Sequence, residues 1–301
     1  MTATADVAYL APEGFAGLLE TELGDRVRAR HERLFVAKPE GPPPVWVANV
    51  WRTPVEIPIV SIGDGVRRLK AIQRNWVLYS ADHHRRAALI QEQLPKVSAK
   101  PLVFGHAPPT APLGSWTLVR PDLILAAPDC SSPFPNGEAR FVEDRDAPPS
   151  RAYLKLWETF TRTGVQPAPG ELCLDLGSSP GGWTWVLASL GARVLSVDKA
   201  PIEPHIASMP GVTYRKESAF GLDPRSAPPV DWLFSDVICY PARLLGLVER
   251  WLAAGKARRF VCTLKFQAET DFDTIERFRA IPGSQIFHLH ANKHELTWVK
   301  L

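Results

Sequence analysis

The C-terminal half of the chain alternates between short apolar runs and segments with apolar positions at helical spacing. Short apolar runs suit strands buried on both faces, and the segments between them suit covering helices. This alternation indicates a mostly parallel, doubly wound α/β sheet, and two closing runs joined by a short turn indicate an antiparallel edge. The predicted strands span residues 172–176, 193–197, 212–215, 230–235, 260–264, 285–289 and 296–299, and the predicted helices span 151–160, 183–188, 241–254 and 272–280.

The N-terminal part has strand-like runs around one amphipathic segment, which predicts a smaller α+β domain over residues 1–90. Its expected strands are 7–10, 33–36 and 45–50, and its expected helix is 14–23.

Prolines punctuate the chain between Pro95 and Trp116, and they argue against long helices or central strands there. A pair of strands is expected to follow, at 116–119 and 123–126. We therefore expect residues 91–145 to be largely a linker. The second domain should occupy residues 146–301, with Ser150 as the N-cap of its first helix.

The stretch Leu172–Trp183 is the candidate cofactor turn, because an apolar run leads through small residues into a helix. Glycines let the backbone approach a ligand closely, and exposed amides at a helix start favour a carboxylate. The dinucleotide motif would need glycine at Ser179, and no P-loop lysine follows the turn. Asp198 ends the next run, where it could bind a ribose diol. The turn and Asp198 together indicate a nucleoside cofactor that has no phosphate, and S-adenosylmethionine is the candidate. The alternative is an ordinary strand-turn-helix whose glycines are needed only for the shape of the backbone.

Composition and charge favour a globular protein over a membrane-spanning one. The 301 residues carry a net charge of +3 and are 45% hydrophobic, which favours a globular chain of two domains. No apolar run reaches about eighteen residues, so no membrane span is expected. The opening residues 1–6 lack a basic leader pattern, and we expect a cytoplasmic protein. The four cysteines have no C-x-x-C spacing, so we expect neither zinc nor disulfides.

The densest basic run lies between Val66 and Arg86, where six cations surround Trp76 and Tyr79. Guanidinium groups can bind phosphates and aromatic rings can stack on unpaired bases, so the run is a candidate RNA-binding segment. An ordinary solvated charged face is an equally good interpretation. The cations are Arg67, Arg68, Lys70, Arg74, Arg85 and Arg86.

Polar residues just after apolar runs are candidates for chemistry, because ligands of doubly wound sheets bind at the carboxyl ends of the strands. Asp236 and Lys265 each follow such a run, and Glu295 begins the last strand. Lys155 lies on the helix before the cofactor turn. Each residue alone would more often be a helix cap or an ion-pair partner, but the four together form a candidate catalytic group.

With these motifs the chain resembles the FtsJ-like RNA 2′-O-methyltransferases, whose hallmark is a Lys-Asp-Lys-Glu tetrad. The tetrad corresponds here to Lys155, Asp236, Lys265 and Glu295, the segment 150–156 matches the first motif, and 175–183 matches the cofactor turn. Within the family the chain is most similar to bacterial enzymes that methylate a cytidine ribose of 23S ribosomal RNA. The resemblance covers residues 131–301 well.

The resemblance implies a Rossmann-like methyltransferase fold, S-adenosylmethionine as cofactor and RNA as substrate, with no DNA partner and a monomer favoured. It implies a ferredoxin-like first domain and a reduced THUMP-like segment within residues 91–145. An acid expected near the adenine falls at Ser218 or its neighbour Glu217. The implied cofactor-binding residues are Ser150, Asp175, Gly177, Ser179, Pro180, Gly181, Gly182, Trp183, Asp198, Glu217, Ser218 and Asp236.

The residue types suit transfer of a methyl group to a ribose hydroxyl, which needs in-line positioning and removal of a proton. Lys265 is the expected general base, and Asp236 and Glu295 would orient the lysines. Two alternatives remain open: an RNA-binding module that has lost activity, and a small-molecule methyltransferase. His288, His290 and His294 lack a carboxylate to complete a metal site, so surface placement is the simpler interpretation.

Overall fold

The structure is a computed structural model that describes residues 2–3 and 6–301 and divides into two compact units, residues 1–141 and 142–301. Met1, Thr4 and Ala5, which belong to the segment used to argue against a leader peptide, lie outside the described residues. The second unit begins four residues before the expected start at residue 146. No helix among the described residues is long and apolar enough to cross a membrane.

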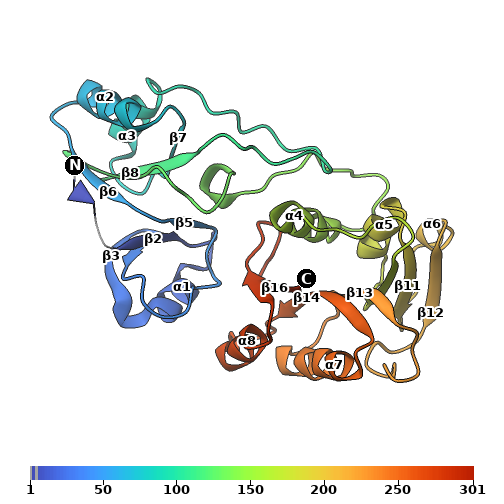
Figure 1. The fold of residues 1–301 in the computed structure, drawn as a ribbon. Coiled ribbons are helices and arrows are strands. Elements are labelled where there is room, and N and C mark those ends of the chain that lie inside the picture. The colour runs from blue at the N-terminus through green and yellow to red at the C-terminus, as the bar shows by residue number, and fades with distance from the viewer. Residues whose placement is uncertain (1, 4–5) are drawn as a thin grey trace. The chain divides into compact units, whose positions relative to one another are not determined.

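The first unit contains a four-stranded antiparallel sheet whose centre is formed by β2 and β4. Figure 1 shows α1 beside this sheet. The expected strand at 45–50 is wrong over its first four residues, because Trp46 instead packs as a fully buried ring against Phe15. The elements are β2 (Val7–Leu10), α1 (Ala16–Leu23), η1 (Gly24–Arg26), β3 (Val27–His31), β4 (Leu34–Ala37) and β5 (Asn49–Trp51).

The first unit also contains a five-stranded sheet in the order β1-β6-β9-β8-β7. The middle segment 91–145 is therefore not simply a linker, because its two strands pair with each other and β9 pairs with β6. A core of Ile57, Trp116 and Ile124 packs beneath α2 and α3. The elements are β1 (Thr2–Ala3), β6 (Val55–Pro58), α2 (Ile62–Ile72), β7 (Trp76–Leu78), α3 (His84–Gln91), β8 (Gly114–Arg120), β9 (Leu123–Ala127) and η2 (Pro135–Gly137).

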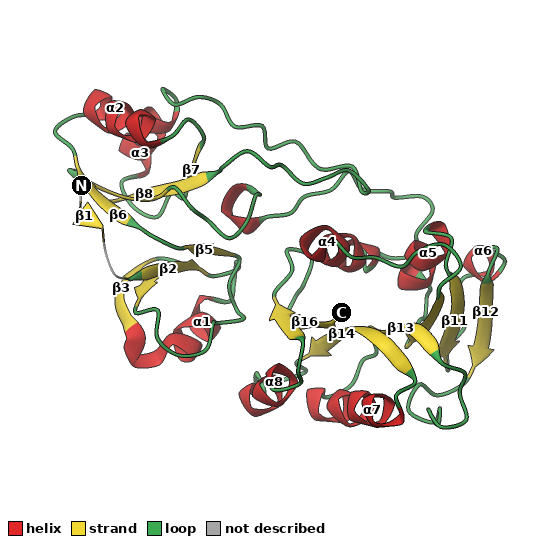
Figure 2. Cartoon of the chain, viewed as in Figure 1, coloured by secondary structure: helices red, strands yellow, loops and turns green. Residues whose placement is uncertain are grey.

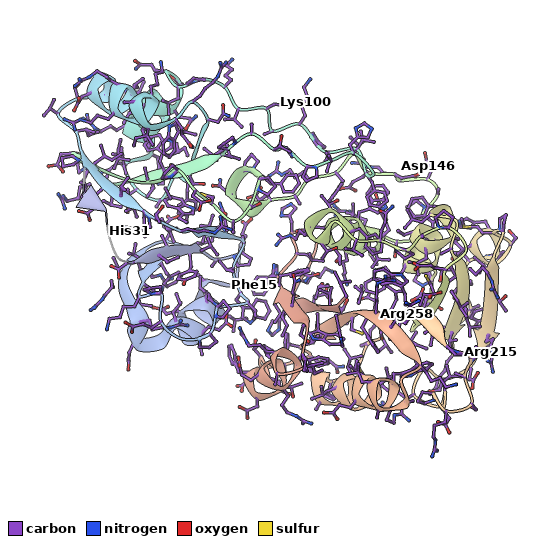
Figure 3. All side chains as sticks on the ribbon, in the orientation of Figure 1. Phe15, His31, Lys100, Asp146, Arg215 and Arg258 are labelled. Atoms are coloured by element: carbon purple, nitrogen blue, oxygen red, sulfur yellow. The ribbon has the colours of Figure 1, made fainter. Side chains whose placement is uncertain are left out.

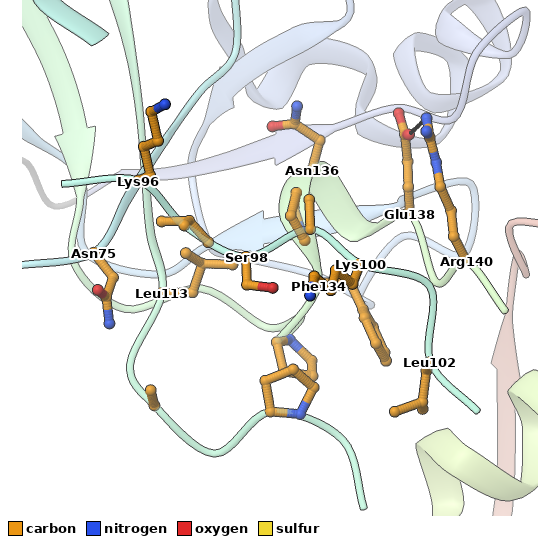
Figure 4. Close-up of a pocket in the computed structure, with 16 residues that line it drawn as sticks. Asn75, Lys96, Ser98, Lys100, Leu102, Leu113, Phe134, Asn136, Glu138 and Arg140 are labelled. Atoms are coloured by element: carbon orange, nitrogen blue, oxygen red, sulfur yellow. Dashed lines mark hydrogen bonds and ion pairs between the residues drawn. The ribbon is translucent and has the colours of Figure 1, made fainter. Parts of the chain in front are cut away.

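The irregular segments of the first unit enclose a cavity of about 500 Å³. Figure 4 shows Phe134 and Leu102 on its wall and the ion pair of Glu138 with Arg140 at its margin. The proline-rich passage thus has a defined path although it contains no helix.

The second unit is a seven-stranded sheet in the order β12-β11-β10-β13-β14-β16-β15. Every pair from β12 to β14 is parallel, as the apolar pattern predicts. Figure 1 and Figure 2 show α4 and α5 on one face and α7 and α8 on the other. The elements are α4 (Tyr153–Thr163), β10 (Leu172–Leu176), α5 (Gly182–Ser189), β11 (Arg193–Asp198), α6 (Pro204–Ala207), β12 (Val212–Lys216), β13 (Val230–Ser235), α7 (Pro241–Ala254), β14 (Ala257–Lys265), α8 (Phe272–Arg279), β15 (Ser284–Phe287) and β16 (Glu295–Lys300).

The last strand inserts between its neighbours and does not form the outer edge. β16 pairs antiparallel with both β14 and β15, so β15 is the edge strand. The burial of β16 explains this position: Trp298 is fully buried, packs against Phe260 and Phe278, and donates its indole hydrogen to Ser284 Oγ at 2.8 Å. An inserted strand can bury side chains on both faces.

Ser150 does not cap the first helix of the second unit, contrary to the prediction. Helix α4 begins at Tyr153 with Ala152 in the N-cap position and no capping side chain. Residues 151–152 form a turn, and Ser150 Oγ accepts a long 3.4 Å hydrogen bond from the Ala152 amide.

We expect Trp298→Ala to lower the free energy of unfolding of the second unit by about 3–5 kcal/mol, because it leaves a large cavity in a packed core. Leu301→Ala is the control; this side chain is 37% exposed and should change stability by less than about 0.5 kcal/mol. Calorimetric unfolding of both variants measures the difference. Equal small losses would show that β16 is not anchored by its tryptophan.

Candidate active site

The cofactor turn has a backbone shape that requires glycine at two positions. Gly177 has φ +78°, and a Cβ there would lie 2.6 Å from Val237 Cβ. Gly181 has φ +116° and is the N-cap residue of α5. Both conformations are in the left-handed region that side chains disfavour. The turn therefore packs directly on the segment that follows β13, which carries Asp236.

A chain of buried polar groups supports the turn from below. Thr184 Oγ1 donates to Asp175 Oδ2 at 2.7 Å and lies 3.1 Å from Ser196 Oγ, which donates to Ser178 Oγ at 2.7 Å. All four residues are at most 5% exposed. Thr184, Ser196 and Ser178 were missed by the sequence analysis, since hydroxyl residues inside apolar runs resemble ordinary core positions.

Asp175 is the one carboxylate inside this network. Its Oδ1 atom is buried and has no hydrogen-bond partner among the described residues. Burial raises the pKa of Asp175 to about 7, against the hydrogen bond from Thr184, and the negative charges of Asp236 and Asp198 add to the increase. The side chain is therefore poised to bind a hydrogen-bond donor or a cation.

Asp198 ends β11 beside the turn, where the sequence places it. Its Oδ2 accepts from the Ser179 amide at 3.0 Å and its Oδ1 from the Ala200 amide at 2.9 Å. Each carboxylate oxygen can accept a further hydrogen bond. Asp198 thus braces the turn and can still bind a diol.

Glu217 and Ser218 follow β12 next to Asp198. The Glu217 amide donates to the Asp198 carbonyl at 3.0 Å, so the two strand ends are adjacent. The carboxylate of Glu217 pairs with Arg215, labelled in Figure 3, at 2.9 Å. The Ser218 side chain has no such ion pair and is only partly buried.

The remaining cofactor candidates gather around the same turn. Ser150 Oγ lies where a Cβ on Gly182 would come within 2.8 Å, so it faces the start of α5. The Pro180 carbonyl accepts a hydrogen bond from the Glu203 amide at 3.0 Å. The Trp183 indole is buried, donates to the Ala152 carbonyl at 2.9 Å and contacts Phe234 edge-on. The indole of Trp183 therefore packs in the core of the second unit.

The four tetrad candidates form one ion-pair network. Lys155 Nζ lies 3.0 Å from Asp236 Oδ1 and 2.7 Å from Glu295 Oε1. Lys265 Nζ lies 3.2 Å from the same Asp236 oxygen and donates to the Asp236 carbonyl at 2.6 Å. Their side chains are 10% to 18% exposed. Residues separated by up to 140 positions therefore meet in one small, mostly dry cluster.

Sheet register holds this cluster together. Lys265 and Glu295 are direct cross-strand partners of the antiparallel pair β14 and β16. Asp236 follows Ser235, the last residue of β13, which pairs with Cys262 of β14. Only Lys155 comes from a helix. The insertion of β16 beside β14 is thus what brings Glu295 to the carboxyl end of the parallel strands.

The two lysines differ in their electrostatic surroundings. Burial acts to lower the pKa of Lys155, but the carboxylates of Asp236 and Glu295 outweigh it and raise the pKa above its usual value. Lys155 is thereby fixed as a cation. Lys265 touches one carboxylate oxygen, which it shares with Lys155.

Glu158 positions the turn that precedes Glu295, a role the sequence analysis missed. It is 1% exposed, pairs with Arg162 at 2.8 Å, and accepts from the His290 amide at 2.8 Å. Asn292 supports the same turn by donating to the Glu295 carbonyl at 3.2 Å. A glutamate that faces its own arginine four residues on resembles an ordinary surface pair in sequence.

Surface placement is wrong for one of the three histidines. His288 is 4% exposed, and its Nε2 lies 3.1 Å from the Lys293 carbonyl. Burial lowers the pKa of His288 to about 4, so the ring is neutral. Within the described part of the chain, no group of three or more histidine, cysteine, aspartate or glutamate side chains could hold a metal ion.

The basic run does not present aromatic rings for stacking. Trp76 is fully buried and donates to the Leu69 and Gln73 carbonyls, and Tyr79 is 5% exposed and accepts from the Arg33 amide. The prediction of interleaved cations and exposed rings is therefore wrong, because Trp76 fills the core beneath α2 and α3, and Tyr79 fills a second core with residues of β2, β4 and β9. The cations lie outside these cores: Lys70 on α2, Arg85 on α3 and Arg74, between α2 and β7, are exposed.

Residues 148–267 match the model of the FtsJ-like methyltransferase family. This range contains the cofactor turn and three of the four clustered residues.

Curated proteins similar to this chain carry the name ribosomal RNA large subunit methyltransferase M. The protein from Halorhodospira halophila is 37% identical over 147 residues, which are 48% of this chain and 42% of that one. The protein from Laribacter hongkongensis is 37% identical over 166 residues, which are 52% and 46%. The chain thus spans about half the length of the curated relatives it matches.

Solved structures are more distant. TrmN from Thermus thermophilus has a TM-score of 0.37 and 14% identity, with all of both chains covered. The Methanococcus jannaschii fibrillarin pre-rRNA processing protein has a TM-score of 0.34 and 15% identity, covering 46% of this chain and 69% of that one.

Asp175 predicts a pH dependence of stability. A carboxyl with a pKa near 7 in the fold and 3.8 when unfolded holds its proton more tightly in the native state. Its contribution is therefore fully present below pH 3.8 and lost as pH rises through 7. We expect the unfolding free energy of the wild type, relative to Asp175→Asn, to fall by up to roughly 4 kcal/mol across that window, at about 1.4 kcal/mol per pKa unit.

Calorimetric unfolding of both proteins from pH 4 to pH 8 measures this difference. His288 is present in both proteins, so its effect on the unfolding free energy cancels in the difference. Its lowered pKa makes the fold less stable as the pH falls below 6.5, which is the opposite direction to Asp175. A difference that stays constant with pH would contradict a raised pKa at Asp175.

Proposed function

We propose that this protein is an S-adenosylmethionine-dependent RNA ribose 2′-O-methyltransferase that acts on 23S ribosomal RNA. The observation that carries the proposal is the contact of Lys155, Asp236, Lys265 and Glu295 in one network. The network lies beside a turn shaped for a nucleoside cofactor. The names of the relatives support a ribosomal RNA substrate.

The residues around the turn fit S-adenosylmethionine, which supplies an electrophilic methyl group on a sulfonium. Asp198 would bind the ribose diol through its free lone pairs. The unpartnered Asp175 Oδ1 suits the positively charged part of such a cofactor. Ser179, Pro180, Gly181 and Gly182 would contact it through backbone, with Ser150 and Trp183 beside them, and Glu217 or Ser218 would meet the adenine.

Lys265 is the proposed general base. Lys155 is fixed as a cation by two carboxylates, so the base is assigned to Lys265, which would take the proton of a 2′-hydroxyl in its neutral amine form. Asp236 holds Lys265 through both its carbonyl and its carboxylate, which fixes the position of the amine. Lys155 would then stabilise the negative charge that develops on the attacking oxygen.

The first unit is proposed to hold the RNA. Lys70 on α2, Arg85 on α3 and Arg74 between α2 and β7 are exposed, as are Lys96 and Lys100 beside the cavity. Such cations bind phosphates without reading sequence. We expect residues 1–90 to be a ferredoxin-like domain and residues 91–145 to contain a reduced THUMP-like segment. We also expect a cytoplasmic location and a monomer.

Lys265→Ala should lower kcat by roughly 10²–10⁴-fold, since it removes the general base. The Kd for S-adenosylmethionine should change by less than about twofold, because the turn is untouched. Lys256→Ala is the control, because Lys256 directly precedes the other end of the same strand. Radiolabelled methyl transfer to in vitro transcribed 23S RNA, with calorimetric cofactor binding, measures both quantities. Wild-type turnover in Lys265→Ala would refute the assignment of the base.

RNA binding should depend on the exposed cations on and between α2 and α3. Replacing Lys70, Arg74 and Arg85 together with alanine should reduce the slope of log K against log salt by about 2, because the variant neutralises fewer phosphates of the RNA. Arg30→Ala is the control, because Arg30 already pairs with Glu20 at 2.7 Å. Filter binding of the same transcript at several salt concentrations gives the slopes. Unchanged slopes would place the RNA on another surface.

A further inference from the structure

The segment between β13 and α7 exposes two large apolar side chains directly beside the tetrad. Ile238 is 77% exposed and Tyr240 is 63% exposed. They alternate with Val237, which packs on Gly177 of the cofactor turn, and with Cys239, which is 6% exposed. One side of the segment is thus anchored in the site, and the other side turns an aromatic and an aliphatic surface to solvent.

Two observations tie this segment to the reacting groups. Lys265 donates to the carbonyl of Asp236, the residue that begins the segment, at 2.6 Å. Burial raises the pKa of the Cys239 thiol to about 11, while the positive charges of Arg243 and Lys265 both act to lower it. Arg243 and Lys265 therefore both lie near Cys239.

The guanidinium of Arg243 is held in place by an aromatic ring, and no carboxylate of the described residues pairs with its charge. Its guanidinium stacks on the Phe220 ring, with 3.9 Å between Cζ and the ring centroid. No carboxylate of the described residues lies within ion-pair distance of it. Its backbone amide donates to the Tyr240 carbonyl at 3.0 Å, which fixes the first turn of α7 against the exposed segment.

We propose that Ile238, Tyr240 and Arg243 form a platform for an unpaired nucleotide of the substrate RNA, next to the ribose that reaches Lys265. The base stacks on Tyr240 and Ile238, and Arg243 binds a backbone phosphate. Rings stack on unpaired bases of any identity, and a cation without a carboxylate partner complements phosphate. This inference rests on the proposed function and names the residues that position its substrate.

The test measures kcat and KM for in vitro transcribed 23S RNA, and the Kd for S-adenosylmethionine, in platform variants. Tyr240→Ala should lower kcat/KM for RNA by about tenfold or more, as loss of one stacked base does, without changing cofactor binding. Tyr240→Phe, which keeps the ring, should recover most of this loss. Arg243→Ala should weaken RNA binding and reduce its salt slope by about 1. Arg193→Ala, at the opposite end of the sheet, is the matched control.

Three results would overturn the platform. Tyr240→Ala could retain wild-type kcat/KM, or it could lose cofactor affinity in the same proportion, which would indicate a structural role. Sedimentation could also reveal a wild-type dimer that Tyr240→Ala dissociates, which would make a second copy of the chain the occupant. By contrast, a wild-type protein that binds cofactor and methylates no RNA would refute the proposed function itself.

Discussion

The carboxylate of Asp236 is the interaction on which the site depends. One of its oxygens lies within 3.2 Å of two ammonium groups, Lys155 and Lys265, in a cluster that is largely removed from water. Two cations could not share so dry a position without that negative charge between them. Glu295 supplies a second carboxylate to Lys155 alone, so the two lysines differ in the number of carboxylates that they contact.

The fold supplies Asp236 and its partners by register. Parallel strands end at one edge of the sheet, and the inserted antiparallel β16 begins at that same edge, so Glu295 faces Lys265 across the ladder. Glu158 then fixes the turn before Glu295 from beneath, through the His290 amide. Gly177 allows the cofactor turn to pack on Val237, so the same short segment contacts the cofactor turn and Lys265 and carries the exposed side chains of Ile238 and Tyr240.

The sequence predicts the strand ends well, because apolar runs with a following polar residue mark them directly. Asp236, Lys265 and Asp198 lie at strand ends as expected, and Lys155 forms ion pairs with Asp236 and Glu295 in the structure. What the sequence hides is three-dimensional burial. Trp76 and Tyr79 look like part of a basic surface but fill the core, and Thr184 looks like core but supports Asp175. Ser150 has the residue type of a cap, yet a turn at residues 151–152 separates it from the start of α4.

The most direct measurement is the chemical position of the methyl group transferred by the wild-type protein. The RNA product, labelled from S-adenosylmethionine, would be hydrolysed in alkali and its label traced by chromatography. A ribose 2′-O-methyl group blocks cleavage of the adjacent phosphodiester, so the account predicts that the label remains in an alkali-resistant dinucleotide. Label recovered in mononucleotides would place the methyl group on a base and contradict the role given to the two lysines and two carboxylates.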